Sequence, residues 1–365
     1  MIFRRVDFIP ARTQRFFYPL DFSADLCAFQ VNVMAGVADK NTDKARKKRY
    51  HTSMIPESTA HYTSLAKALV SLYGSSVSIV HTDRLSGGDI NKSYALTLNT
   101  GDRIFMKANA KENASFFTAE AAGLSAIAET ECIGTPRILC TGTDDGEEVG
   151  YSFFLLEFIE SGKKRDDYFE VLGRELAAMH KAETKGLVNS DSSATNTKKF
   201  GFFMDNFIGA REQKNRPADK WVSFFRDQRL LPQFKAADSY FSDEDRKRNT
   251  KLLDRLDTFL PEPEKPSLIH GDLWSGNVLA DKDGKAILID PAVYVGNAEA
   301  DLAMTELFGG FPQEFYAAYR EVNPLQAGYE ERRDLYNLYH LLNHLNMFGQ
   351  SYLNPVKSIV AEYID

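Results

Sequence analysis

The chain contains few cysteines and no long apolar run. Only three cysteines occur among its 365 residues, and Cys27, Cys132 and Cys140 are too scattered to predict a disulfide framework or a zinc site. No stretch approaches the roughly 18 apolar residues of a membrane-spanning helix. The first residues also lack the continuous apolar core of a secretory signal. We therefore expect a protein of the reducing cytoplasm that does not bind membranes.

Charge is negative overall but unevenly distributed. The net charge is −7, yet residues 1–53 hold ten Lys/Arg against five Asp, so the remaining chain is acidic. An acidic body argues against a nucleic-acid-binding surface. The basic cluster at 44–49 is typical of a solvated, disordered stretch, with binding to nucleic acid or anionic lipid as the alternative. We expect residues 1–55 to form a poorly ordered extension, or to precede a true start at Met54.

Residue periodicity divides the rest of the chain into two parts, which we expect to be domains at 56–160 and 161–365. The first part is strand-rich, with a helix between its third and fourth strands, and the second is mainly helical. We therefore predict an α+β fold with an N-terminal antiparallel sheet. The expected elements are a helix over 62–73, strands starting at 77 and over 93–98 and 103–107, a helix over 114–127, strands over 138–142 and 151–158, a helix ending near 180, and a long helix through 335–345.

The most informative motif is HGDLWSGN at 270–277, followed by ILIDPA at 287–292. Two short apolar runs separated by Asp281-Lys282-Asp283-Gly284 lie between the motifs, a pattern that predicts a β-hairpin. The arms of a hairpin run antiparallel, so the residue entering the first arm meets the residue leaving the second. We expect Asn277 and Asp290 to lie side by side, with Asp272 close by.

Such a cluster of hard oxygen ligands suits Mg²⁺ carrying nucleotide phosphates. Asp272 and Asn277 also have the D-x-x-x-x-N spacing of a kinase catalytic loop. We predict that Asp272 is the catalytic base that takes the proton of an attacking hydroxyl. Asn277 and Asp290 are the predicted metal ligands. The alternative for Asp272 is a loop residue that caps a turn.

A cation and an acidic residue in the first part complete the predicted phosphate site. Lys107 ends the strand Ile104–Lys107, from which it would reach the α and β phosphates of ATP. Glu120 follows thirteen residues later, within the next expected helix, and is the natural partner of that lysine. Either residue alone is equally typical of an ordinary surface position.

Four further residues are predicted to bind the nucleotide. Gly87 and Gly88 lie between the first two strands, where paired glycines let backbone N–H groups approach phosphate oxygens. The same pair is also compatible with a plain hairpin turn. Glu157 and Phe158 lie where the two parts meet, and backbone groups there would bind adenine, while the Glu157 side chain has a structural alternative.

Two further residues of the 270–277 motif have expected roles outside the phosphate site. Trp274 would line the acceptor pocket or stack on a sugar, although a loop tryptophan equally often anchors its own loop. His270 is expected to hold the loop through hydrogen bonds, and we give it no catalytic role.

With these residues in place, the chain resembles the fructosamine/ketosamine-3-kinase family, within the aminoglycoside phosphotransferase and choline kinase group. The resemblance covers about 58 to 358, and HGDLWSGN together with the segment at 299–311 is its most specific part. The matching stretches are GGDIN (87–91), FMKAN (105–109), EAAGL (120–124), LLEFIE (155–160), FGFFMDNFIG (200–209), Trp221, RLLPQ (229–233), HGDLWSGN (270–277), IDPAVYVGNAEADLAMTELFGGF (289–311) and LLNHLNMFG (341–349).

The resemblance implies a bilobal protein-kinase-like fold that binds ATP and Mg²⁺ between its lobes. Its substrates would be ketosamines, which are sugar adducts of small amines or glycated proteins. Phosphorylation of the sugar O3 hydroxyl would destabilise the adduct and cause deglycation. Some relatives carry a cysteine in the glycine-rich loop that links dimers. Asp89 stands at that position here, so we expect no such switch and a monomer.

Two alternatives remain open from the sequence. The chain could be a small-molecule kinase of the choline or aminoglycoside type. It could also be a nucleotide-binding scaffold without catalysis, although all the polar groups needed for phosphoryl transfer are present.

Overall fold

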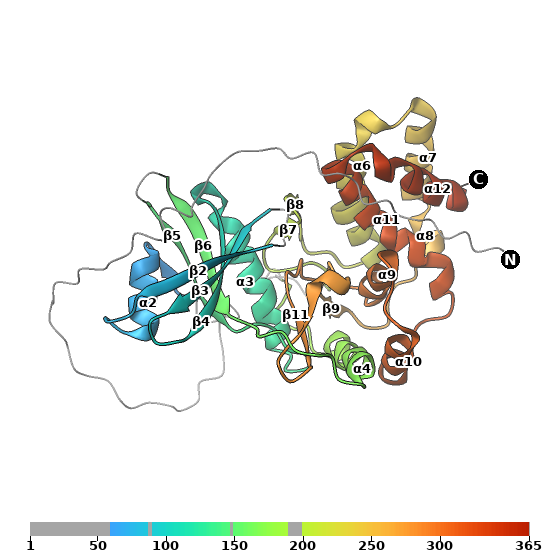
Figure 1. Ribbon diagram of the computed structural model, residues 1–365. Helices are drawn as coiled ribbons and strands as arrows, with labels where there is room; N and C mark the ends of the chain where they lie inside the picture. Colours follow the sequence, from blue (N-terminus) through green and yellow to red (C-terminus); the bar gives the residue numbers. More distant parts are fainter. Residues whose placement is uncertain (1–58, 87–89, 147–148, 189–198, 365) are drawn as a thin grey trace.

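Six strands form one sheet in the computed structural model, which describes residues 59–86, 90–146, 149–188 and 199–364 (Figure 1). The order across the sheet is β1-β5-β6-β4-β3-β2, and neighbouring strands are antiparallel except for β1 and β5. β4 is therefore paired on both sides. The strands are β1 (His61–Tyr62), β2 (Ile79–Leu85), β3 (Lys92–Leu98), β4 (Arg103–Ala110), β5 (Ile138–Asp144) and β6 (Tyr151–Glu157).

Helices α2 (Leu65–Tyr73) and α3 (Ala114–Ala128) cover opposite faces of this sheet. Ile104 and Met106 of β4 are buried in the cluster that includes α2, whereas Phe105 packs with α3. Successive side chains of a strand point to opposite faces, so Lys107 shares the α3 face with Phe105. The alternation along β4 thus directs Lys107 toward α3.

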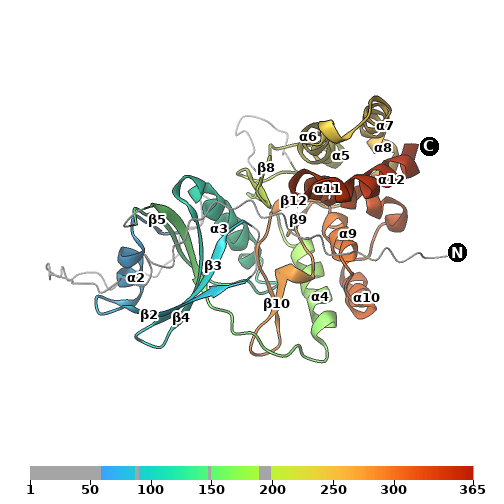
Figure 2. The ribbon, with the colours of Figure 1, turned by 45° about the horizontal axis from the view of Figure 1, so that its top comes forward.

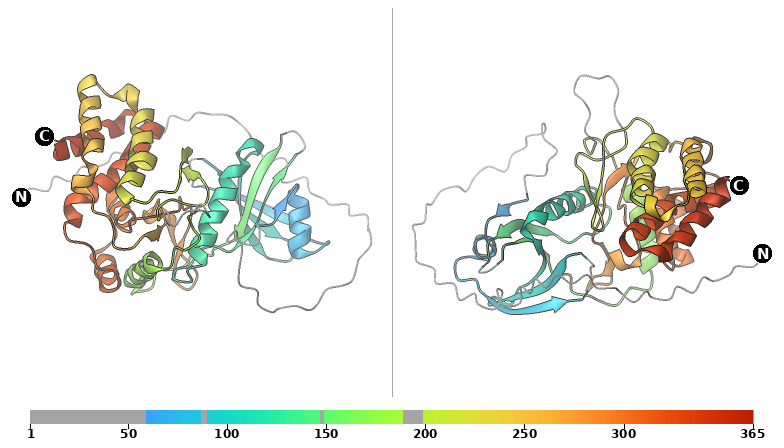
Figure 3. Two further views of the ribbon diagram at one scale, coloured as in Figure 1. Left: turned by 180° about the vertical axis from the view of Figure 1, so that it is seen from behind. Right: turned by 90° about the horizontal axis from the view of Figure 1, so that it is seen from above.

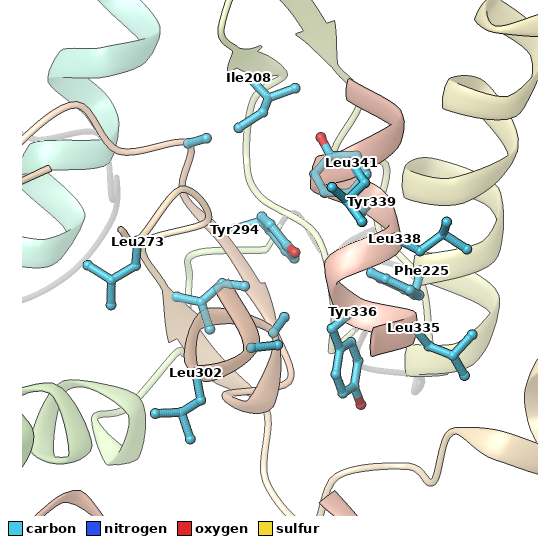
Figure 4. Close-up of a cluster of buried hydrophobic side chains, with 14 of the residues drawn as sticks. Ile208, Phe225, Leu273, Tyr294, Leu302, Leu335, Tyr336, Leu338, Tyr339 and Leu341 are labelled. Atoms are coloured by element: carbon cyan, nitrogen blue, oxygen red, sulfur yellow. The ribbon is translucent and has the colours of Figure 1, made fainter. Parts of the chain in front are cut away.

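The second part of the chain is mainly helical. Its core includes large rings from several helices, and Figure 4 shows Phe225, Tyr336 and Tyr339 within it. No described helix is long and apolar enough to cross a membrane. The helices are α4 (Tyr168–Lys181), α5 (Trp221–Phe224), the π-helical turn Phe225–Leu230, α6 (Leu231–Ala236), α7 (Asp243–Asp254), α8 (Leu256–Phe259), α9 (Glu299–Leu307), α10 (Gln313–Val322), α11 (Tyr329–Phe348) and α12 (Leu353–Ile364), with 3₁₀ turns at Lys111–Asn113, Asp238–Tyr240, Ser275–Asn277 and Gln350–Tyr352.

Three small antiparallel strand pairs lie between the sheet and the helices (Figure 1). One side of this border is α3, which Figures 2 and 3 show beside the small strand pairs. The contact is close, because a Cβ on Gly123 of α3 would lie 3.2 Å from Cγ2 of Val293. The pairs are β7 (Asn206–Ile208) with β8 (Arg211–Gln213), β9 (Ser267–Ile269) with β12 (Tyr294–Gly296), and β10 (Val278–Ala280) with β11 (Ala286–Leu288).

The predicted fold class, an α+β chain with an N-terminal antiparallel sheet and a helical second part, is confirmed. The expected strand and helix order of the first part is also confirmed, with the short parallel strand β1 added. Of the small pairs, only β10–β11 was expected. The predicted extension, residues 1–55, lies outside the described residues.

Candidate active site

The loop that carries Asp272 begins where the buried strand β9 ends. Asp301 of α9 holds the backbone of this loop, because its carboxylate accepts hydrogen bonds from the His270 and Gly271 amides at 2.6 and 2.8 Å. Gly271 has φ +80°, and a Cβ there would lie 2.2 Å from the carbonyl oxygen of Ala292. Only glycine fits this turn, because both its dihedral and its surroundings exclude a side chain.

Asp301 is itself fully buried and is paired with a second buried residue. His180 at the end of α4 lies 3.1 Å from its Oδ2 through Nε2, and the other ring nitrogen of His180 lies 2.7 Å from the Tyr319 hydroxyl. Burial opposes the charge on Asp301, but the His180 hydrogen bond and charge outweigh it and lower the pKa of the carboxyl. The loop therefore rests on a buried anion.

Asp272 is half-buried and is held by Asn277. The Asn277 amide donates to the Asp272 carbonyl oxygen at 2.8 Å and to its carboxylate at 3.2 Å. Burial, and then the charge of Asp290, raise the pKa of Asp272 to about 7, against the opposing effect of the Asn277 hydrogen bond. A carboxyl with this pKa changes protonation state near neutral pH, as a general base requires.

The hairpin β10–β11 brings Asp290 beside Asn277, as the motif predicted. Val278 pairs with Leu288, and the Ile289 amide donates to the Asn277 carbonyl oxygen at 3.1 Å. His270 holds the same segment, since its Nε2 lies 2.9 Å from the Ile289 carbonyl oxygen. The expected buttressing role of His270 is thereby confirmed. Asp290 has φ +55°, a left-handed conformation that is unusual for a residue with a side chain.

Lys107 connects the sheet to this hairpin. Its ammonium donates to Glu120 of α3 and to Asp290, each at 2.6 Å. The expected Lys107–Glu120 pair is therefore present. Burial lowers the pKa of Lys107, but the carboxylates of Asp290 and Glu120 outweigh it and the pKa is raised. Burial raises the pKa of Glu120, partly offset by Lys107.

The donor set fits a hard cation that keeps part of its own coordination shell. The Asp290 side chain is 41% exposed and is thus accessible to a cation. Asn277 donates its amide hydrogens to Asp272, so its side-chain oxygen is available as a metal ligand. Among the described residues no group of three or more His, Cys, Asp and Glu could hold a metal. A closed protein cage is therefore absent there. Mg²⁺, which commonly combines one or two carboxylates with phosphates and water, matches this arrangement.

The other predicted nucleotide-binding residues lie on the sheet side. Gly87 and Gly88 fall outside the described residues, as does Asp89. Glu157 ends β6, where its carboxylate lies 3.6 Å from Arg137 Nε. The ring of Phe158, the next residue, lies 3.8 Å from the Arg103 guanidinium.

Trp274 lies at the surface of the Asp272 loop. It is 38% exposed, and its ring packs over Gly276, where a Cβ would approach it to 2.4 Å. It meets Phe308 edge-on at 6.4 Å between ring centroids. The side chain therefore both covers its own loop and presents an aromatic surface to solvent.

Asp301 and His180, which position the Asp272 loop, were not predicted from the sequence. Both lie in helices far from the motif along the chain. A signal was present, since Asp301 is an acidic residue inside the strongly matching 299–311 segment, but an acid in the first turn of a helix is ordinary in itself.

Comparisons with known proteins show which family the sequence and the fold resemble. The sequence model of a family described as fructosamine kinase matches residues 61–365. A probable ketoamine kinase of Synechocystis sp. is 37% identical over 312 residues, which is 84% of this chain and 97% of the relative. The chloroplastic protein-ribulosamine 3-kinase of Oryza sativa subsp. indica is 36% identical over 330 residues, 88% and 92% of the two chains. The crystal structure of a provisionally assigned fructosamine-3-kinase from Haemophilus somnus superposes with a TM-score of 0.71 at 28% identity, covering 83% of this chain and 97% of that one.

Proposed function

This chain belongs to the fructosamine kinase family, and we propose that it transfers the γ-phosphoryl group of ATP to the sugar O3 hydroxyl of ketosamines. The observation that carries the proposal is the meeting of Asp272, Asn277 and Asp290 with Lys107. These side chains come from three separate segments, and they form the set of groups that phosphoryl transfer requires. The rice relative, a protein-ribulosamine 3-kinase, supports the class of substrate.

In this proposal each side chain has one task. Asp272 accepts the proton of the O3 hydroxyl while the O3–phosphorus bond forms and the bond from phosphorus to the β-phosphate oxygen breaks, releasing ADP. Lys107, held by Glu120, positions the α and β phosphates. Asn277 and Asp290 hold Mg²⁺, which supplies charge neutralisation at the phosphates when bound.

The remaining predicted contacts complete the cleft. The backbone at Gly87 and Gly88 would approach the phosphates, and the backbone at Glu157 and Phe158 would bind adenine. Trp274 would line the acceptor side, which its exposed ring two residues from Asp272 supports. We propose nucleotide-binding and acceptor-binding lobes at 56–160 and 161–365.

The 3-phosphorylated adduct would be unstable and release its amine, so the physiological role would be deglycation of amines or glycated proteins. We propose a monomer. The cytoplasmic location stays a prediction, because the rice relative is a chloroplastic protein.

The test is a direct acceptor assay. Purified protein is incubated with ATP, Mg²⁺ and lysine carrying a fructose, ribose or erythrose adduct, and ADP release is followed with ³¹P NMR of the product. We expect a sugar phosphate from the ketosamine adducts and none from unmodified lysine. The variant Asp272→Asn is the matched control for contaminating kinases. Phosphorylation of choline or an aminoglycoside without any turnover of ketosamines would overturn the proposal in favour of that alternative.

A further inference from the structure

The backbone around Asp290 is strained and must be held on both sides. Asp290 has φ +55°, in the left-handed region that residues with a Cβ rarely adopt. Upstream, the Ile289 amide and carbonyl are bonded to Asn277 and His270. Such a conformation persists only where the surroundings over-determine it, so the contacts downstream of Asp290 are equally important.

Downstream, two side-chain amides of the β7–β8 hairpin hold the chain. Gln213 Nε2 donates to the Ala292 carbonyl oxygen at 3.0 Å, and Asn206 Nδ2 donates to the Val293 carbonyl oxygen at 2.7 Å. Asn206 and Gln213 are directly opposite each other in the hairpin. Paired residues of an antiparallel ladder project from one face, so both amides approach the same segment.

Asn206 and Gln213 belong to a buried set of hydrogen-bonded side-chain amides that also includes Asn215. We call these three residues the amide network. Gln213 Nε2 also donates to Asn206 Oδ1 at 2.7 Å, as does Asn215 Nδ2 at 3.0 Å. The Tyr339 hydroxyl donates to Gln213 Oε1 at 2.6 Å. Each amide therefore has its oxygen facing a donor and its nitrogen facing an acceptor, so a flipped amide would break several bonds at once.

A buried cation fixes the far end of the network. Arg229 has no exposed surface and donates through Nη2 to Asn215 Oδ1 at 2.6 Å. Among the described residues no carboxylate pairs with it. Instead its guanidinium lies 3.9 Å from the Tyr294 ring centroid and 4.6 Å from that of Phe224. Figure 4 shows Tyr294 and Tyr339 in the same buried cluster. The aromatic faces stabilise the charge, and the Asn215 oxygen accepts from it together with the carbonyl oxygens of Lys214 and Gln228.

From this geometry we propose that Asn206 and Gln213 are positioning residues for the metal-binding carboxylate of Asp290. The inference rests on the proposed role of Asp290 in the kinase reaction. The two amides touch neither substrate nor cation. They fix the carbonyls two and three residues after Asp290, and so hold its carboxylate where Asn277 can share a cation with it. Loss of such supporting bonds typically weakens metal binding by about 10–100-fold.

The experiment measures cation binding without turnover. Mn²⁺ binding is titrated by EPR in the presence of a non-hydrolysable ATP analogue, for the wild type and for Asn206→Asp and Gln213→Glu. Each substitution keeps the shape of the side chain. Asn206→Asp removes the donor to the Val293 carbonyl, and Gln213→Glu removes the donor to the Ala292 carbonyl. We expect Mn²⁺ affinity to fall about 10-fold or more in each.

Asn343→Asp is the matched control. Asn343 is similarly buried and bonds Gln233 and Met347, and among the described residues no hydrogen bond joins it to the Asp290 segment or to the amide network. We expect its Mn²⁺ affinity to equal that of the wild type, with circular dichroism confirming that all variants are folded at the titration temperature. Should either amide variant fail to fold, Tyr339→Phe removes only the hydroxyl that orients Gln213, and a loss of about 3-fold is expected, smaller than that for a lost amide donor.

Unchanged affinity in the amide variants, or an equal loss in Asn343→Asp, would overturn the inference. So would a wild-type protein that binds no Mn²⁺ with the analogue. A wild type that binds Mn²⁺ tightly but phosphorylates no ketosamine would refute the proposed function alone, because the positioning effect is measured on the cation.

Discussion

Two loops meet at the site, and they are supported by different chemistry. The loop of Asp272 rests on an ionic support, Asp301 with His180, both almost without exposed surface. The segment of Asp290 rests on the neutral amide network. Both supports are buried, so the difference cannot be attributed to burial.

The difference follows from which backbone groups each loop presents. In the Asp272 loop, the buried backbone N–H groups of His270 and Gly271 need an acceptor. A carboxylate accepts both and forms stronger bonds than a neutral oxygen. The segment after Asp290 presents carbonyls, which need donors. Amides supply these donors without adding a further charge beside Lys107 and the cation site.

The largest effect is expected from removing the chemistry while leaving both supports whole. Asp272→Asn should lower kcat by roughly 10²–10⁴-fold, because the amide cannot take the hydroxyl proton. Asp272 contacts Asn277 and takes part in neither support. The thermal unfolding temperature should therefore match that of the wild type. A large drop in the unfolding temperature would show that Asp272 itself contributes to the stability of the supports. The chemistry and the supports could then not be compared separately.

Asp301→Asn tests the ionic support directly. The substituted amide presents an N–H group where a carboxylate oxygen accepted one, which leaves a buried donor unpaired. Leaving a buried hydrogen-bonding group without its partner costs about 1–3 kcal/mol of unfolding free energy, and more at a charged group. We expect a loss of about 3 kcal/mol in urea unfolding, together with at least a 10-fold lower kcat as the Asp272 loop shifts. Wild-type kcat in a folded variant would contradict the view that the charge positions the loop.

The contacts within the site could be predicted from the sequence where they are local. Asn277 and Asp290 meet because a short hairpin joins them, and an Asp-Gly turn between apolar runs is enough to predict that hairpin. Lys107 and Glu120 meet because a strand is followed at once by a helix that packs on it. Alternation in β4 then decides which face of the sheet Lys107 occupies.

Neither support could be predicted in this way, since both are tertiary. Asp301 stands in the first turn of a helix, where an acid is favoured even in isolation. Asn206 and Gln213 lie in short strands of an irregular region, where polar residues are expected at the surface. Their burial depends on the packing of α11 and of the β9–β12 pair, and no local pattern encodes it. The matching stretches of the resemblance include Asp301 and Asn206, but not Gln213, and they do not indicate what these residues do.

Lys107→Met sharpens the comparison from the sheet side, because Lys107 bonds Asp290 independently of the amide network. Loss of a hydrogen bond to a charged group costs about 1.5–3 kcal/mol, so KM for ATP should rise roughly 10-fold or more while the fold stays intact. Glu120→Gln keeps the lysine and its bond to Asp290 and weakens only its other bond, so a smaller rise in KM is expected. Nucleotide kinetics unchanged by Lys107→Met would remove this residue from the site.

The smallest expected effect is a difference between the two supports in how their contributions to the unfolding free energy depend on pH. The pKa of Asp301 is lowered in the folded protein, so its contribution to stability is complete above its unfolded pKa of about 3.9 and is lost as the pH falls through the folded value. Asparagine and glutamine side chains do not titrate, so the amide network carries no such dependence. We therefore expect the difference in unfolding free energy between wild type and Asp301→Asn to be constant from pH 7 to 5. It should then shrink below pH 4 by about 1.4 kcal/mol for each unit by which the pKa is lowered. A difference that stays constant down to pH 3 would mean that hydrogen bonding, without the charge, holds the Asp272 loop, and the two supports would then act by the same physics.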